Sequence, residues 1–91
     1  MREVTVDTAA ELIEGGASAV DVREPDEFEE VRVPGARPIP LGEISSRVDE
    51  IPTAGPVLLI CAKGGRSMAA AEFLQSRGVE AVNVLGGTDA W

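Results

Sequence analysis

Every side chain from residue 57 to residue 60 is apolar: Val57, Leu58, Leu59 and Ile60. A strand with one face in water alternates apolar and polar residues, so this run indicates a parallel strand covered by helices on both faces. The chain has 91 residues, 44% apolar and 26% charged, which suits one modest core. We therefore expect a single α/β domain over 1–91, with a mainly parallel central sheet flanked by helices on both faces.

Strand and helix signals alternate along the rest of the chain. Short β-type runs predict three further strands and a brief edge strand, over 3–6, 19–22, 81–85 and 37–40. Helical spacing and a proline suited to a first turn predict four helices, over about 8–14, 25–31, 43–48 and 67–77. This alternation is typical of an α/β fold.

Capping residues set the expected ends of two helices. Thr8 and Glu11 match a capping box at the start of the first helix. Ser67 is expected to cap the helix that follows the apolar run, and Gly78 to end that helix in the left-handed conformation. Trp91 is expected to anchor the core.

Composition excludes several classes of function. A net charge of −8 argues against a nucleic-acid partner, since phosphate binding needs clustered Lys and Arg. The chain has no histidine and one cysteine, so it lacks an ordinary metal ligand set, an internal disulfide and the usual general base. No apolar run approaches the roughly 18 residues of a membrane span, and the amino terminus lacks the apolar stretch of a signal peptide. We expect a cytoplasmic protein without a metal, cofactor or membrane partner.

Negative charge is concentrated between residues 24 and 30, at Glu24, Asp26, Glu27, Glu29 and Glu30. Such a run is ordinarily the solvated face of a helix. A docking patch for a basic partner is the alternative.

Cys61, the only cysteine, follows the apolar run at its carboxyl end, where ligands of parallel sheets bind. On composition alone, a lone cysteine is a small core hydrophobe. Here it precedes a glycine pair and a helix start, with Lys63 and Arg66 on either side of the glycines. Positive charge and a helix amino terminus lower the pKa of a thiol. We therefore favour a reactive thiolate.

The loop residues each have a structural and a functional interpretation. Gly64 and Gly65 provide the positive φ that a turn needs, or let several amides converge on an anion. Arg66 is a surface charge, or it seals that nest and binds an oxyanion through two parallel hydrogen bonds. Ser67 is an N-cap, or its hydroxyl donates to the sulfur of Cys61.

Three further charged residues are candidates for the site. Asp21 and Arg23 follow one another closely at the end of the expected strand over 19–22. One interpretation is an ion pair that braces the loops at the strand ends. The alternative is that Arg23 steers an anionic donor molecule toward the site. Lys63 is expected to point outward and attract that anion.

The loop Cys61-Ala62-Lys63-Gly64-Gly65-Arg66-Ser67 resembles the active-site loop of the rhodanese homology domain, where a cysteine begins a loop closed by arginine. Three more segments resemble that family in the same order, over 21–28, 33–40 and 84–91. One departure is at residues 31 and 32: Val31 and Arg32 stand where the family commonly has glycine and histidine, and no role is carried over to Arg32.

The resemblance implies a single-domain sulfurtransferase. Cys61 would take a sulfane sulfur from a small anionic donor such as thiosulfate and pass it to cyanide, a thiol or a sulfur-acceptor protein. The loop residues that would bind the anion and stabilise the persulfide are Ala62, Lys63, Gly64, Gly65, Arg66 and Ser67. No general base is required if Cys61 is already a thiolate.

The same resemblance bears on the alternative functions. Related domains that act on phosphate or arsenate have one more residue between cysteine and arginine, whereas four residues lie between Cys61 and Arg66. The shorter loop favours sulfur. A binding module that keeps the fold and docks a partner through residues 24–30 is the main alternative, and a phosphatase or arsenate reductase is a further one.

Overall fold

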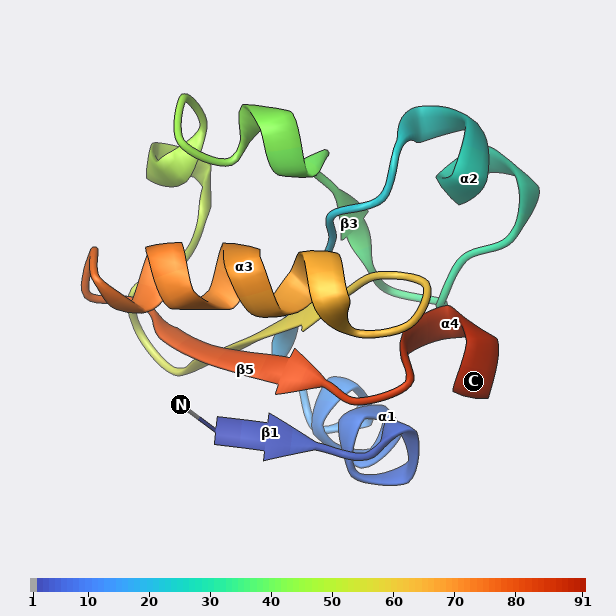
Figure 1. Ribbon diagram of the computed structural model, residues 1–91. Helices are drawn as coiled ribbons and strands as arrows, with labels where there is room; N and C mark the ends of the chain where they lie inside the picture. Colours follow the sequence, from blue (N-terminus) through green and yellow to red (C-terminus); the bar gives the residue numbers. More distant parts are fainter. Residues whose placement is uncertain (1) are drawn as a thin grey trace.

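A computed structural model describes residues 2–91 as one parallel five-stranded sheet in the order β1-β5-β4-β2-β3 (Figure 1). The strands are β1 (Arg2–Val4), β2 (Ser18–Asp21), β3 (Arg37–Pro38), β4 (Pro56–Ile60) and β5 (Glu80–Val84). The apolar run lies in β4, which is central because it pairs with β2 on one side and β5 on the other.

Helices cover both faces of this sheet. They are α1 (Val6–Glu14), α2 (Pro25–Glu30), α3 (Gly65–Gln75) and α4 (Gly87–Ala90), with 3-10 turns η1 (Leu41–Glu43) and η2 (Val48–Glu50). Figure 1 shows α3 on one side of the sheet and α1 on the other. The predicted α/β architecture is therefore confirmed. Among residues 2–91, no helix has the length and apolar character needed to cross a membrane.

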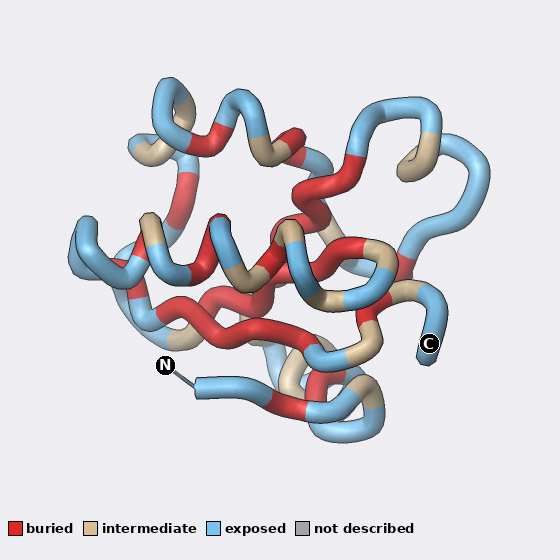
Figure 2. Tube along the Cα trace, viewed as in Figure 1, coloured by how far each residue is buried: buried red, intermediate tan, exposed pale blue. Residues whose placement is uncertain are grey.

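Alternation along β4 divides the core into two clusters. Leu59 and Cys61 belong to the cluster that includes buried residues of α3, whereas Leu58 and Ile60 belong to the cluster beneath α1. The inner strands β2, β4 and β5 are buried except at their first residues, whereas the edge strands β1 and β3 are largely exposed (Figure 2). Burying one such leucine or isoleucine stabilises the fold by about 1.5–3 kcal/mol. This alternation points the Cys61 side chain toward α3.

Two predicted caps are wrong. Thr5 caps α1, and its side chain accepts from the Thr8 amide at 3.4 Å, because β1 ends at Val4 and leaves Thr5 extended ahead of the helix. The cap of α3 is Gly64 in the left-handed conformation, so the helix begins two residues before Ser67. Ser67 is buried within the first turn instead. Gly78 does adopt the left-handed conformation, with φ of +87°.

Two other expectations are also wrong. No α-helix forms over 43–48: η1 ends at Glu43, η2 begins at Val48, and residues 44–47 between them form turns, in keeping with the weak helix propensity of Ser45 and Ser46. Trp91 is 42% exposed and does not anchor the core. The preceding α4 is a single turn that approaches the sheet through the backbone at Gly87, which leaves the last side chain at the surface.

Candidate active site

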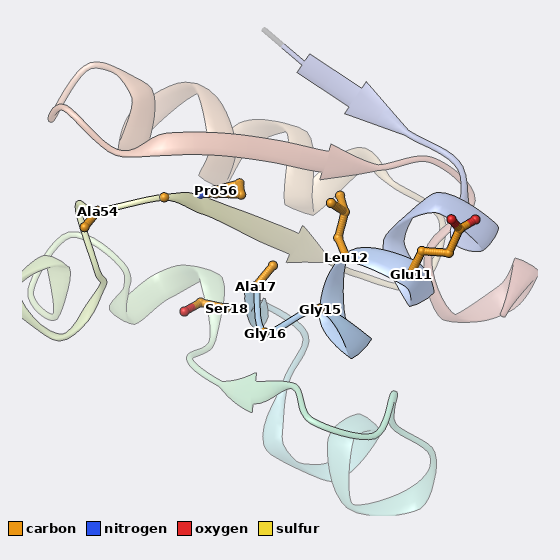
Figure 3. Close-up of a pocket in the computed structure, with 9 residues that line it drawn as sticks. Glu11, Leu12, Gly15, Gly16, Ala17, Ser18, Ala54 and Pro56 are labelled. Atoms are coloured by element: carbon orange, nitrogen blue, oxygen red, sulfur yellow. The ribbon is translucent and has the colours of Figure 1, made fainter.

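The two ends of the sheet differ in chemistry. At the amino end, a pocket lies between the carboxyl end of α1 and the segment before β4 (Figure 3). Among residues 2–91, Glu11 is the only charged residue that lines it. At the carboxyl end, Cys61 follows β4 and begins the loop that leads into α3. Ligands of parallel sheets bind at the carboxyl end. The candidate site is therefore at Cys61.

The sulfur of Cys61 lies beside groups that can donate hydrogen bonds to it. The residue is 1% exposed and free of any disulfide. The Gly64 amide donates to Sγ at 3.0 Å, and the Ser67 hydroxyl lies 3.3 Å from Sγ. Burial raises the pKa of the thiol, but hydrogen bonds from the Ser67 hydroxyl and from the amides of Ser67, Gly64 and Lys63 outweigh it. The net pKa of Cys61 is lowered, which favours the anionic sulfur.

The first amides of α4 fix the backbone on the other side of Cys61. Thr88 donates to the carbonyl oxygen of Cys61 at 2.8 Å, and Asp89 donates to that of Ala62 at 3.0 Å. Gly87 makes this approach possible, because a Cβ there would lie 1.9 Å from the Cys61 oxygen. The glycine pair after β5 therefore positions the active-site loop.

Arg66 forms a bidentate ion pair with Glu27. Its Nη1 donates to Oε1 at 2.7 Å and its Nη2 to Oε2 at 3.0 Å, and both side chains are about a third exposed. Arg66, then the Glu24 amide, lowers the pKa of Glu27 from 4.5 to about 2. The carboxylate thus occupies the guanidinium edge that was expected to hold a donor anion.

Asp21 and Arg23 form a buried ion pair, with Nη2 donating to Oδ2 at 2.8 Å and exposures of 0% and 5%. Arg23 also donates to the carbonyl of Val31 at 2.5 Å. Asp21 accepts from the Arg23 amide as well. Of the two interpretations of these residues, the structure has the ion pair that braces the loops. It connects the end of β2 to the segment that follows α2.

The remaining loop residues line an open hollow of about 300 Å³ beside Cys61, namely Ala62, Lys63, Gly65 and Arg66. Lys63 is exposed, as expected of a side chain that points outward. The hollow is large enough for a small anion. Among residues 2–91, no group of three or more histidine, cysteine, aspartate or glutamate side chains is placed to hold a metal ion.

Comparison with known proteins gives the family. The sequence model of the family described as the rhodanese-like domain matches residues 5–91 of this chain. The chain belongs to the rhodanese-like domain family. It is 45% identical over 76 residues to the uncharacterized protein YqhL of Bacillus subtilis (strain 168), with 82% of this chain and 60% of YqhL covered. It is 32% identical over 93 residues to the putative sulfurtransferase YtwF of the same strain, with 100% of this chain and 90% of YtwF covered.

The fold agrees with this assignment. The crystal structure of a rhodanese-like domain protein from Staphylococcus aureus matches with a TM-score of 0.92 at 33% identity, covering 100% of this chain and 91% of that one. The chain spans only 60% of YqhL, so what the whole of that protein does is not carried over. The family assignment made from the sequence is confirmed, and the relatives in this family include the putative sulfurtransferase YtwF.

Three residues of this rhodanese-like domain were not predicted as part of the site. Glu27 was assigned to a solvated face, although its spacing from Glu24, a capping-box spacing, indicates that it turns back toward the helix start. Asn83 interrupts an apolar strand, which is a recognisable signal of a buried polar group. Gly87 follows a second glycine, and that pair signals a close backbone approach.

Replacing Gly64 by alanine tests the amide contact in the rhodanese-like loop. Gly64 has φ of +110°, and an added Cβ would lie 3.5 Å from the nearest atom, so the cost is backbone strain of about 1 kcal/mol. Because its amide donates to Sγ, we expect slower alkylation of Cys61. Gly78→Ala, with φ of +87° and open space, is the matched control. The two variants should lose equal stability, but Cys61 should be alkylated more slowly in Gly64→Ala than in Gly78→Ala. Equal reactivity of Cys61 in the two variants would contradict the role given to the Gly64 amide.

Proposed function

We propose that this rhodanese-like domain, spanning residues 1–91, is a sulfurtransferase that carries a sulfane sulfur on Cys61. The observation that carries the proposal is the buried sulfur that accepts from the Gly64 amide beside the amino terminus of α3. Converging donors of this kind stabilise a negative sulfur, as an oxyanion hole stabilises a negative oxygen. Membership of a family that includes a putative sulfurtransferase supports the same conclusion.

The reaction has two steps. The Cys61 thiolate attacks the outer sulfur of thiosulfate, so that a sulfur–sulfur bond to Cys61 forms and sulfite leaves with the electron pair of the broken bond. An acceptor then attacks the outer sulfur of the persulfide: cyanide gives thiocyanate, and a thiol gives a new persulfide. The Cys61 thiolate leaves in this second step and is ready for the next donor.

The proposed partners follow from this chemistry. The donor is a small anionic sulfur compound, for which Lys63 provides attraction at the rim of the hollow. The acceptor is a thiol or a sulfur-acceptor protein, and neither a nucleic acid nor a membrane takes part. The proposal places the protein in the cytoplasm, where thiols are kept reduced.

Formation of thiocyanate from thiosulfate and cyanide tests the proposal. We expect turnover of this pair, with no hydrolysis of an aryl phosphate and no reduction of arsenate by a thiol. The four residues between Cys61 and Arg66 form a loop one residue shorter than that of the related oxyanion enzymes. Hydrolysis of the aryl phosphate without any use of thiosulfate would overturn the proposal.

Glu27→Gln is expected to lower the KM for thiosulfate and leave kcat nearly unchanged. The substitution removes a carboxylate that competes with the donor anion for Arg66. The pair is partly exposed, so its loss should cost less than about 1 kcal/mol of stability. Since Arg66 holds the pKa of Glu27 at about 2, this contribution is present above pH 4.5 and is lost as the pH falls through 2.

Glu29→Gln is the charge-matched control, because Glu29 is exposed on the same helix. Steady-state kinetics with varied thiosulfate measure the KM of each variant. An equal fall in KM for both variants would show a general charge effect and contradict the specific role of Glu27.

A further inference from the structure

Asn83 is a buried polar residue on the sheet face beneath α3, where the other buried residues of the inner strands are mostly apolar. It is 1% exposed and lies on β5, opposite Leu59 of the central strand on one side and Glu3 of β1 on the other. The pairing puts Asn83 on the face that Leu59 and Cys61 share, beneath α3. Burying an amide is costly unless it is fully hydrogen-bonded, so its partners show what it does.

The partners of Asn83 fix the orientation of its amide. Nδ2 donates to the carbonyl oxygen of Gly64 at 3.3 Å and to Oε2 of Glu3 at 3.2 Å. Both partners are acceptors, so turning the amide over would place its oxygen against two other oxygens. Oδ1 therefore faces Ser67, at 2.5 Å from its hydroxyl oxygen.

The Ser67 hydroxyl has one proton and two neighbours that can accept it. Oδ1 of Asn83 is an acceptor only, and at 2.5 Å it lies closer to the hydroxyl than Sγ of Cys61 does, at 3.3 Å. While Cys61 is a thiol, the proton therefore goes to Asn83, and the hydroxyl presents a lone pair to the sulfur. The hydrogen bond from the Ser67 hydroxyl that lowers the Cys61 pKa is one to the anionic sulfur. A lone pair suits a neutral thiol, whose S–H can donate to it.

An anionic sulfur needs the opposite arrangement. A thiolate only accepts, so a favourable contact requires the Ser67 hydroxyl to rotate and donate to Sγ. The rotation removes the donor from Asn83, which remains buried without it. Asn83 and the anionic sulfur thus compete for the same proton.

We propose that Asn83 is a positioning residue that holds the Ser67 hydroxyl proton away from Cys61 while the sulfur is a thiol and releases it when the sulfur becomes an anion. The role rests on the proposed function of Cys61 as the sulfur carrier. Asn83 touches neither donor nor acceptor. Through Ser67 it sets how readily Cys61 gives up its proton to water.

Charged groups on the surrounding elements also act on Cys61 and stay in place in the test. They are Arg66 on α3, paired with Glu27 of α2, together with Lys63 of the loop, Asp21 of β2, paired with Arg23, Asp89 of α4 and Glu3 of β1. Their charges are present in all the variants below. Asn83→Leu also removes the donors to Glu3 and to the Gly64 carbonyl, and the Ser67→Ala background, in which the same contacts are lost, separates that effect from competition for the Ser67 proton.

The test is the rate at which iodoacetamide alkylates Cys61 as a function of pH. In this reaction the thiolate forms a carbon–sulfur bond and iodide leaves, so the rate follows the thiolate fraction. Asn83→Leu removes the competing acceptor at similar volume and should increase the rate about tenfold at a pH below the thiol pKa, since a hydrogen bond to a charged group is worth roughly that factor.

Ser67→Ala provides the decisive background. Without the hydroxyl, Asn83→Leu should change the alkylation profile little, because the residue acts through Ser67. If Asn83→Leu increased the alkylation rate equally with and without Ser67, the proposal would be overturned. An unchanged or slower alkylation rate in the Asn83→Leu single variant would overturn it as well.

A measurement on the unaltered residue 83 covers the case in which Asn83→Leu does not fold. The side-chain amide resonances of Asn83 should shift with the same midpoint as the Cys61 thiol in the wild type, and should not shift in Ser67→Ala. Resonances that do not follow the thiol in the wild type would overturn the proposal. Neither measurement requires sulfur transfer, so a failure of the proposed function would be seen separately.

Discussion

Cys61→Ser is expected to reduce thiocyanate formation from thiosulfate and cyanide on the order of a thousandfold or more, to the rate without protein. A serine hydroxyl is a weak nucleophile unless a base activates it, and the sequence has no histidine to do so. The hydrogen bonds around residue 61 would hold a neutral hydroxyl but could not make it anionic. Steady-state assays of thiocyanate measure the effect.

The substitution should leave the fold intact, because serine is close to cysteine in size. Equal thermal stability of the two proteins would show that the loss is chemical. Cys61→Ala is a second variant that carries no hydroxyl. Turnover that survives in either folded variant would show that Cys61 is not the sulfur carrier.

Gly87→Ala is expected to have the largest effect on stability, about 3 kcal/mol or more. Gly87 has φ of +51°, and an added Cβ would lie 1.9 Å from the carbonyl oxygen of Cys61 and 2.7 Å from that of Ala62. Both obstacles are backbone atoms of the active-site loop, so relief requires α4 or the loop to move. Denaturant unfolding measures the loss, and alkylation of Cys61 reports movement of the loop.

Gly16→Ala separates this clash from ordinary backbone strain. Gly16 also has a left-handed conformation, with φ of +100°, but an added Cβ there meets nothing within 4 Å. Its cost should be only about 1 kcal/mol, with Cys61 unaffected. Equal stability and equal thiol reactivity of the two variants would contradict the account of how α4 positions the loop.

The fold could be predicted because the strand and helix signals along the chain indicate the same α/β arrangement. The unbroken apolar run 57–60 required a covered parallel strand, and Cys61 followed at its carboxyl end. The wrong predictions arose where tertiary contacts decide between similar local choices. Thr5 and Thr8 could both cap the first helix, and the end of β1 selects Thr5.

Only those site residues that lie close to Cys61 in the sequence could be predicted. The sequence places Gly64 and Ser67 near Cys61, since they share one loop and helix start. Contacts from distant segments depend on strand order and register, which spacing within the loop does not specify. Glu27 reaches Arg66 across 39 residues and Asn83 reaches Ser67 across 16, and both alter what the loop can do.

The most direct test of the central claim is the intact mass of the protein after incubation with thiosulfate and removal of the excess. We predict that the wild type gains the mass of one sulfur atom, located on the peptide that contains Cys61, and loses it on addition of cyanide. Cys61→Ser should gain nothing. A wild-type protein that takes up no sulfur, or a Cys61→Ser protein that takes up as much, would contradict the claim that Cys61 carries a persulfide.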